Sequence, residues 1–258
     1  MPTRLVSAVV DSADPSALGH WWARALGWTV TYESADEVDI APAAEGEAGA
    51  GPSLELVFVP VSGSKVGVNQ VHLDLAAPGP GDQDRLVAAL VASGARRTDV
   101  GQPTDADFVV LADPEGNEFC VLGRHEVYAD TGPIGAIVVN TADPVASGRF
   151  WSAATGWPVA RSDERFVGLR APDGTGPYLE LIRSAGTGAD ARPKDRVHLD
   201  VAPFADDDQA AETARLVAAG ARPVDVGQLG PDGARGPGVN WDVLAAPDGH
   251  EFCVLSPR

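Results

Sequence analysis

The run NEFCVLG at residues 117–123 returns almost unchanged as HEFCVLS at residues 250–256. Each copy follows a turn sequence, DPEG at 113–116 and PDG at 247–249. Within each copy a glutamate and a cysteine alternate with apolar residues, which is the period of a β-strand with two different faces. The repetition indicates that one structural unit occurs twice in the chain.

The correspondence extends over most of the sequence. Four further pairs of segments match, namely 12–28 with 141–157, 53–59 with 178–184, 71–77 with 197–203, and 90–102 with 216–228. The sequence therefore predicts two domains, residues 1–124 and 133–258, joined by a linker at 125–132. The second domain has an additional Gly/Pro-rich segment at 229–240, which predicts a longer loop.

Each repeat has the same expected order of elements, strand then helix then further strands, twice over. In the first repeat we expect helices at 15–26 and 83–93, ended by Gly27 and Gly94, and strands at 5–10, 53–59, 70–76, 108–112 and 118–122. This order predicts an α+β fold in which each domain consists of two βαβββ modules, with the helices outside the sheet.

Composition limits the class of partner. The chain has 258 residues and a formal net charge of −18, which disfavours nucleic acid and anionic membranes as partners. No apolar run reaches the roughly 18–20 residues that span a bilayer, and the N-terminal sequence does not resemble a signal peptide. We therefore expect a cytoplasmic protein. Cys120 and Cys253, the two cysteines, occupy matching places in the repeats and do not indicate a disulfide framework.

Strand alternation separates a core face from a second face that carries polar groups. In VHLDL, Val71, Leu73 and Leu75 should face the helices, so His72 and Asp74 point the other way. The same alternation, with Trp241 added as a ring that could stack on a planar ligand, predicts a set of ligand-binding residues. They are Ser7, Asp11, Val57, Asp74, Glu118, Cys120, Asn140, Ile182, Asp200, Trp241, Glu251 and Cys253.

The histidines at 72 and 198 allow three interpretations. Each could be a hydrogen-bonded structural residue, could orient a ligand, or could act as a general acid or base with a carboxylate on a neighbouring strand. The candidate catalytic residues are therefore His72 with Glu55 and His198 with Glu180.

These motifs together resemble the vicinal oxygen chelate superfamily, which includes glyoxalase I, extradiol dioxygenases and bleomycin-resistance-type proteins. The resemblance rests on the ADP-helix-LGW block at 13–28, the VHLD strands at 71–74 and 197–200, and DPEGNEFCVL at 113–122. It is narrower to the tandem glyoxalase-like branch of actinobacterial type. The resemblance implies that each domain forms a curved, partly closed mixed sheet of eight strands around a cavity.

The resemblance also implies four metal-binding positions per cavity, occupied in metal-containing relatives by histidine, glutamate, histidine or glutamine, and glutamate. At these positions this chain has Ser7, Glu55, His72 and Cys120 in the first domain, and Ala136, Glu180, His198 and Cys253 in the second. A catalytic divalent ion needs about three protein ligands, so no metal cofactor is favoured. The alternative is an atypical Zn, Fe, Mn or Ni site formed by Glu55, His72 and Cys120 or by Glu180, His198 and Cys253.

The sequence thus predicts a protein that binds a small organic molecule, a metabolite or an antibiotic, without a complete metal site. One alternative is a glyoxalase-like lyase or isomerase, or a dioxygenase, with an atypical metal site. Another is a metal-independent biosynthetic enzyme that uses a His/Glu pair. Since tandem duplication imitates a homodimer, we expect a monomer with internal pseudo-twofold symmetry.

Overall fold

The computed structural model describes residues 3–43, 54–79, 81–184, 195–228, 236 and 238–258. The described residues form two mixed sheets of eight strands with four α-helices. We call the sheet with strand order β14-β15-β16-β13-β1-β4-β3-β2 sheet A, and that with order β10-β11-β12-β9-β5-β8-β7-β6 sheet B. Most of the predicted 229–240 loop lies outside the described residues.

Four βαβββ modules follow one another along the chain, as expected. The first is β1 (Arg4–Ser12), α1 (Pro15–Leu26), β2 (Thr29–Glu33), β3 (Val38–Ala41) and β4 (Glu55–Pro60), and the second is β5 (Val71–Leu75), α2 (Asp82–Ala92), β6 (Arg96–Arg97), β7 (Phe108–Ala112) and β8 (Glu118–Leu122). The third is β9 (Ile134–Thr141), α3 (Pro144–Thr155), β10 (Val159–Ser162), β11 (Phe166–Leu169) and β12 (Tyr178–Arg183). The fourth is β13 (Val197–Ala202), α4 (Gln209–Ala218), β14 (Arg222–Pro223), β15 (Asp242–Ala245) and β16 (Glu251–Val254).

The helix that opens each repeat has the predicted start and end. In α1, the side chain of Asp14 accepts a hydrogen bond from the backbone N–H of Ala17, and Pro15 occupies the first turn. Gly27 ends the helix in the left-handed conformation at φ 68°, which a residue without Cβ adopts without strain. The helix α3 repeats this arrangement with Asp143 and Gly156.

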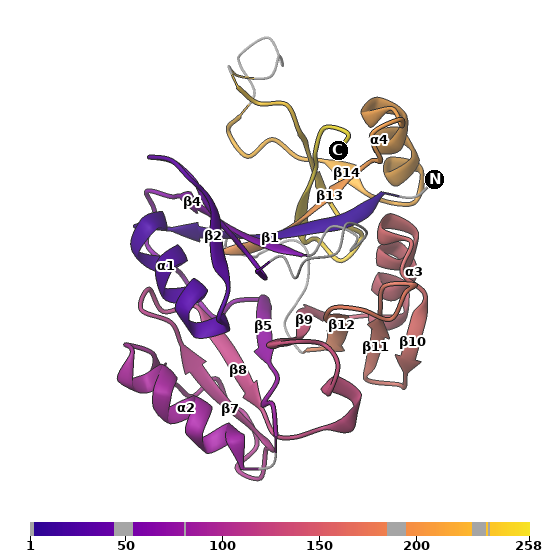
Figure 1. Ribbon diagram of the computed structural model, residues 1–258. Coiled ribbons are helices and arrows are strands. Elements are labelled where there is room, and N and C mark those ends of the chain that lie inside the picture. The colour runs from indigo at the N-terminus through magenta and orange to yellow at the C-terminus, as the bar shows by residue number, and fades with distance from the viewer. Residues whose placement is uncertain (1–2, 44–53, 80, 185–194, 229–235, 237) are drawn as a thin grey trace.

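Each sheet combines one module from each repeat, which differs from the expectation that each repeat forms its own sheet. In sheet A the antiparallel pair β1 and β13 joins the first module to the fourth. In sheet B the pair β5 and β9 joins the second module to the third. Figure 1 shows the same pairing, because the indigo β1 lies beside the orange β13 while β5 lies beside β9.

One apolar core connects the two sheets on their helix side. The helix α1 packs on β3 and β4 of sheet A, and its Trp21 and Trp22 make edge contacts with Phe119 of β8 in sheet B. In the second repeat, Phe150 and Trp151 of α3 contact Phe252 of β16 in the same way. The two modules of a repeat are therefore held together by helix packing, and the sheets join modules of different repeats.

The predicted alternation of the strands is confirmed. Val71, Leu73 and Leu75 belong to the helix-side core, so His72 and Asp74 lie on the opposite face, which we call the distal face. Each sheet has two terminal strands in its order, so in the described part of the chain neither sheet closes on itself.

Candidate functional site

The strand register places Glu55 and Glu180 at different positions, although the sequence repeat had aligned them. In sheet A, Ser7 of β1 lies beside Glu55 of β4. In sheet B, Ala136, the counterpart of Ser7, lies beside Tyr178 of β12. Glu180 lies two residues further on, beside Val138. The first half of sheet B therefore has a tyrosine where sheet A has a glutamate.

The residues of each predicted metal-binding set do not come together, because each sheet combines modules of both repeats. Glu55 lies in sheet A with His198 and Cys253, whereas His72 and Cys120 lie in sheet B with Glu180. The sets Glu55–His72–Cys120 and Glu180–His198–Cys253 each combine residues of both sheets. The sequence could not exclude them, since either partner module offers an identical VHLD strand.

The distal face of sheet A carries a row of polar side chains on four adjacent strands. Glu55, Ser7, Asp200 and Cys253 lie directly beside one another across β4, β1, β13 and β16. The hydroxyl of Ser7 donates to Oδ2 of Asp200 over 3.3 Å, and Nε2 of His198 lies 3.6 Å from Oδ1. Asp200 is only 7% exposed, and its burial raises the pKa of its carboxyl.

A further carboxylate, Asp39 of β3, joins the same face beside Val57. Burial raises the pKa of Asp39 to about 7, and the negative charges of Glu37 and Glu55 add to this effect. Asp39 was not among the predicted residues, although the alternation in VDIA, residues 38–41, would have indicated it. Sheet A thus concentrates acidic groups on one face.

The corresponding row of sheet B is less polar. Tyr178, Ala136, Asp74 and Cys120 lie beside one another across β12, β9, β5 and β8. Burial raises the pKa of Asp74 to about 7 and lowers that of His72 to about 4. His72 is therefore neutral at pH 7, and its 3.5 Å contact with Asp74 is not an ion pair at that pH.

Side chains from the linker and from β10 pack on the distal face of sheet B. The short helix η1 (Glu126–Tyr128) in the predicted linker brings Val127 and Tyr128 against apolar side chains of this face. The hydroxyl of Tyr128 donates to Glu180 over 2.9 Å, and Arg161 of β10 forms an ion pair with Glu180. The Arg161 guanidinium also lies over the rings of Tyr128 and Tyr178, at 5.3 and 4.7 Å. Neither Tyr128 nor Arg161 belongs to a repeated motif, so the sequence carried no signal for them.

Each distal face gathers three possible metal donors. His72, Asp74 and Cys120 in sheet B, and His198, Asp200 and Cys253 in sheet A, have donor atoms within 4.8 Å of one another. Imidazole, carboxylate and thiolate are the ligand types that zinc prefers. Oδ1 of Asp74 and Oδ1 of Asp200 are buried without a hydrogen-bond partner among the described residues, so each is available as a ligand. Both groups therefore fit a divalent ion, with aspartate in place of the predicted glutamate.

The cysteine thiols act as hydrogen-bond donors to the aspartates beside them. Burial and the neighbouring carboxylate of Asp74 raise the pKa of the Cys120 thiol. The thiol donates to Asp74, and Cys253 donates to Asp200 in the same manner. Without metal, each cysteine thus acts as a small buried hydrogen-bond donor.

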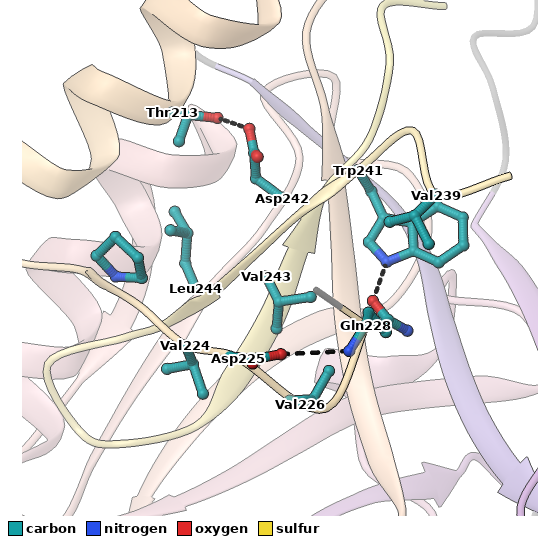
Figure 2. A pocket seen from close by; sticks show the side chains of 11 residues that line it. Thr213, Val224, Asp225, Val226, Gln228, Val239, Trp241, Asp242, Val243 and Leu244 are labelled. Carbon is teal, nitrogen blue, oxygen red and sulfur yellow. Dashed lines mark hydrogen bonds between the residues drawn. The ribbon is translucent and has the colours of Figure 1, made fainter. Parts of the chain in front are cut away.

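A hollow of about 140 Å³ lies at the outer edge of sheet A, between β15 and the segment 223–228. Figure 2 shows Trp241 at one end of it, with its indole N–H donating to Gln228 over 2.9 Å. Much of the remaining lining is valine, contributed by Val224, Val226, Val239 and Val243. Val243 lies directly beside Cys253, so one wall of the hollow adjoins the polar row of sheet A.

The other predicted ligand-binding residues lie on the same faces but take structural partners in several cases. Glu118 pairs with Lys65 at 2.8 Å, and the backbone carbonyl of Asn140 accepts from the buried His250. Ile182 packs on the distal face of sheet B. Asp11 and Glu251 lie at the strand ends of sheet A, on β1 and β16.

A second hollow, of about 340 Å³, lies between Lys65, Arg196 and Glu115. Its charged groups already have partners in the fold. Lys65 binds Glu118, Arg196 donates to backbone carbonyls, and Glu115 accepts from the N–H groups at residues 13 and 14. The charged groups around this hollow therefore connect segments of one sheet to segments of the other.

Comparison with known proteins connects this arrangement to a family. A family model described as a glyoxalase-like domain matches residues 7–122 and again residues 136–255. Glyoxalase I from Zea mays is similar with a TM-score of 0.66 at 15% identity, over 98% of this chain and 92% of that chain. A putative dioxygenase from Bacillus subtilis subsp. subtilis str. 168 is similar with a TM-score of 0.59 at 16% identity, over 99% and 85%. Identities this low indicate a common fold only.

None of the curated proteins compared with the chain matches it. No helix among the described residues has the length and apolar character needed to cross a membrane. The two family matches nonetheless cover most of the sequence, and both repeats have the module order just described. The chain therefore belongs to the glyoxalase-like domain family of the vicinal oxygen chelate superfamily and carries that domain in tandem.

Proposed function

We propose that this protein binds a small organic molecule, a metabolite or an antibiotic, on the distal face of sheet A and at no equivalent place on sheet B. The observation that carries the proposal is the asymmetry between the two faces. Tyr128 and Arg161 occupy the face of sheet B and satisfy Glu180. Among the described residues, Oδ1 of Asp200 on sheet A and Oδ1 of Asp74 on sheet B are both buried without a hydrogen-bond partner, but sheet A adds a second such oxygen, Oδ1 of Asp39, and an adjacent hollow.

Unpaired buried carboxylate oxygens are costly, so they favour a function that supplies their partner. Leaving such a group unsatisfied costs about 1–3 kcal/mol or more, and a bound ligand that donates to it recovers this free energy on binding. The adjacent hollow at Trp241 adds apolar surface beside the polar row. A ligand site of mostly apolar lining with a few polar groups is the usual design of small-molecule sites.

A second candidate function is a metal-dependent lyase, isomerase or dioxygenase reaction of the glyoxalase type. It is favoured by the donor group His198, Asp200 and Cys253 on the same face. These three residues would hold a divalent ion of the zinc class, which would supply Lewis-acid activation of a substrate oxygen. Ser7, which already donates to Asp200, would then orient that carboxylate.

Native mass spectrometry and elemental analysis of the full chain, purified from its own producing cells, test both functions. The binding proposal expects one organic molecule per chain and no stoichiometric metal. Asp200→Asn should lose the retained molecule, whereas the exposed Asp84→Asn, with the same charge change on α2, should keep it. One ion per chain that is lost in Cys253→Ser would favour the second function. A chain with neither adduct, and with no uptake on incubation with cell extract, contradicts both.

A further inference from the structure

The occupied face of sheet B indicates what kind of group sheet A lacks. There, the aromatic ring of Tyr128 packs beside Cys120, Val110 and Leu122. The guanidinium of Arg161 neutralises Glu180 and lies over the tyrosine ring. The chain thus places an aromatic ring and a cation together on the distal face of sheet B, next to a buried carboxylate.

The equivalent region of sheet A has an apolar hollow in which a ring would fit. Trp241 corresponds to Phe108, which packs near Cys120 on sheet B, and Val243 lies beside Cys253. Among the described residues neither Trp241 nor Phe108 makes a ring–ring contact, but on sheet B a further ring, that of Tyr128, packs on the same cluster as Phe108. The hollow of about 140 Å³ beside Trp241 is lined mainly by valine, which suits a flat apolar group.

No arginine or lysine among the described residues forms an ion pair with Asp200 or Asp39, although Nε2 of His198 lies 3.6 Å from Oδ1 of Asp200. Asp200 is 7% exposed, and Oδ1 of both Asp200 and Asp39 has no hydrogen-bond partner among the described residues. The exposed Arg258 acts on both carboxylates through its charge, but no hydrogen bond from it to either is present in the described residues. Buried carboxylates require a paired cation or hydrogen-bond donors.

The two features lie at a separation that a small molecule can bridge. Val243 and Asp200 stand two strands apart in the same row, with Cys253 between them. Two strand spacings correspond to about 10 Å. A molecule with a ring and an amine on a short chain is of this length.

We infer that the ligand of sheet A is an organic cation with a planar apolar ring, whose ring enters the hollow at Trp241 and whose amine or guanidine group pairs with Asp200. This inference rests on the proposed function and names its ligand class. In the bound state the ligand supplies to sheet A the ring and the positive charge that Tyr128 and Arg161 supply to sheet B.

Isothermal titration calorimetry of the full chain with three indoles tests the inference. Tryptamine is a cation, tryptophol is its neutral analogue and indole-3-acetate is an anion, and all three have the same ring. At low ionic strength and pH 7.5 we expect tryptamine to bind at least tenfold more tightly than indole-3-acetate, with tryptophol between them, because opposite charges attract across a buried face.

Variants of the chain then assign the two ends of the ligand. Asp200→Asn should weaken tryptamine about tenfold and leave tryptophol nearly unchanged, whereas Trp241→Ala should weaken all three probes about tenfold. Trp241→Phe should restore most of the affinity because it keeps a ring, and it also reports whether the position tolerates substitution. Asp84→Asn on α2 is the charge-matched control and should bind like the unmodified chain. Far-UV circular dichroism checks that each variant folds.

The outcomes separate this inference from the proposed function. If tryptophol or indole-3-acetate binds as tightly as tryptamine with the same dependence on Trp241, the cation is wrong and the binding site stands. If none of the probes binds and the molecule retained by the purified chain is neutral or anionic, the inference is again overturned alone. If no probe binds and no molecule is retained, both proposals fail.

Discussion

Replacing Arg161 by methionine should destabilise the protein through the carboxylate that it leaves behind. Glu180 is 5% exposed and forms an ion pair with Arg161, whose own side chain is 28% exposed. Breaking a fully buried pair by removing one partner costs about 3–5 kcal/mol. Since water reaches part of Arg161, and Tyr128 still donates to Glu180, we expect a loss of about 2–4 kcal/mol in the free energy of unfolding.

A double-mutant cycle separates the stranded charge from lost packing. Glu180→Gln keeps an acceptor for the tyrosine hydroxyl but removes the charge, so Arg161→Met combined with Glu180→Gln should cost about 2 kcal/mol less than the sum of the single changes. Urea unfolding, followed by circular dichroism and by tryptophan fluorescence, measures these free energies.

Arg170 provides a matched control for the cycle. It lies over the ring of Tyr178 at 4.7 Å, as Arg161 does, but its carboxylate partner Asp130 is 70% exposed. Because water screens Asp130, this ion pair should contribute less than about 1 kcal/mol. Arg170→Met should therefore cost less than Arg161→Met, although it also removes hydrogen bonds to Tyr178 and to the Gly176 carbonyl. The reasoning is refuted if Arg161→Met costs no more than Arg170→Met, or if Glu180→Gln recovers nothing.

Three further predictions concern other parts of the structure. Burial raises the pKa of Asp39 from 3.8 to about 7, so the contribution of Asp39 to stability falls as the pH rises through this range. Asp39→Asn should therefore add about 1–2 kcal/mol to the free energy of unfolding at pH 8, after allowance for partial solvation. At pH 4 the same change should add almost nothing. An equal gain at both pH values would contradict this. A Cβ at Gly19 would lie 2.7 Å from Cγ1 of Val38, so Gly19→Ala should cost about 1–3 kcal/mol, and Val38→Ala should recover part of it in thermal unfolding. The indole N–H of Trp22 donates to a buried carboxylate, whereas Nε1 of Trp151 has no acceptor among the described residues. Trp22→Phe should therefore cost about 1–3 kcal/mol more than Trp151→Phe in urea unfolding. Equal costs would exclude a stabilising role of the Trp22 hydrogen bond.

Local structure could be predicted from the sequence because it depends on neighbouring residues. The aspartate and glycine that bound α1 act within one helical turn, and the structure has both where the sequence predicted them. The strands β7 and β8 also have the predicted limits, Phe108–Ala112 and Glu118–Leu122. Alternation along each strand correctly placed His72 and His198 on the face away from the helices.

The candidate site could be predicted less completely, because register is not determined by alternation alone. A slip of two residues along a strand keeps every apolar side chain on its face. The alignment of Glu55 with Glu180 satisfied that pattern and still differed by two residues from the pairing in the sheets. Partners from irregular segments, such as Tyr128 on sheet B, follow no period and could not be anticipated.

The sequence by itself determined that the chain consists of four similar modules, each with one apolar and one polar face. Only the tertiary structure decided that the first module pairs with the fourth and the second with the third. Both ways of pairing would join a β1-type strand to a VHLD strand with the same apolar pattern, so local preferences do not distinguish them. The choice depends on how the helices α1 and α3 pack against the final strand of their own repeat, which is a contact between residues about a hundred positions apart. That same choice placed Ser7 and Glu55 of the first module beside Asp200 of the fourth, on one face.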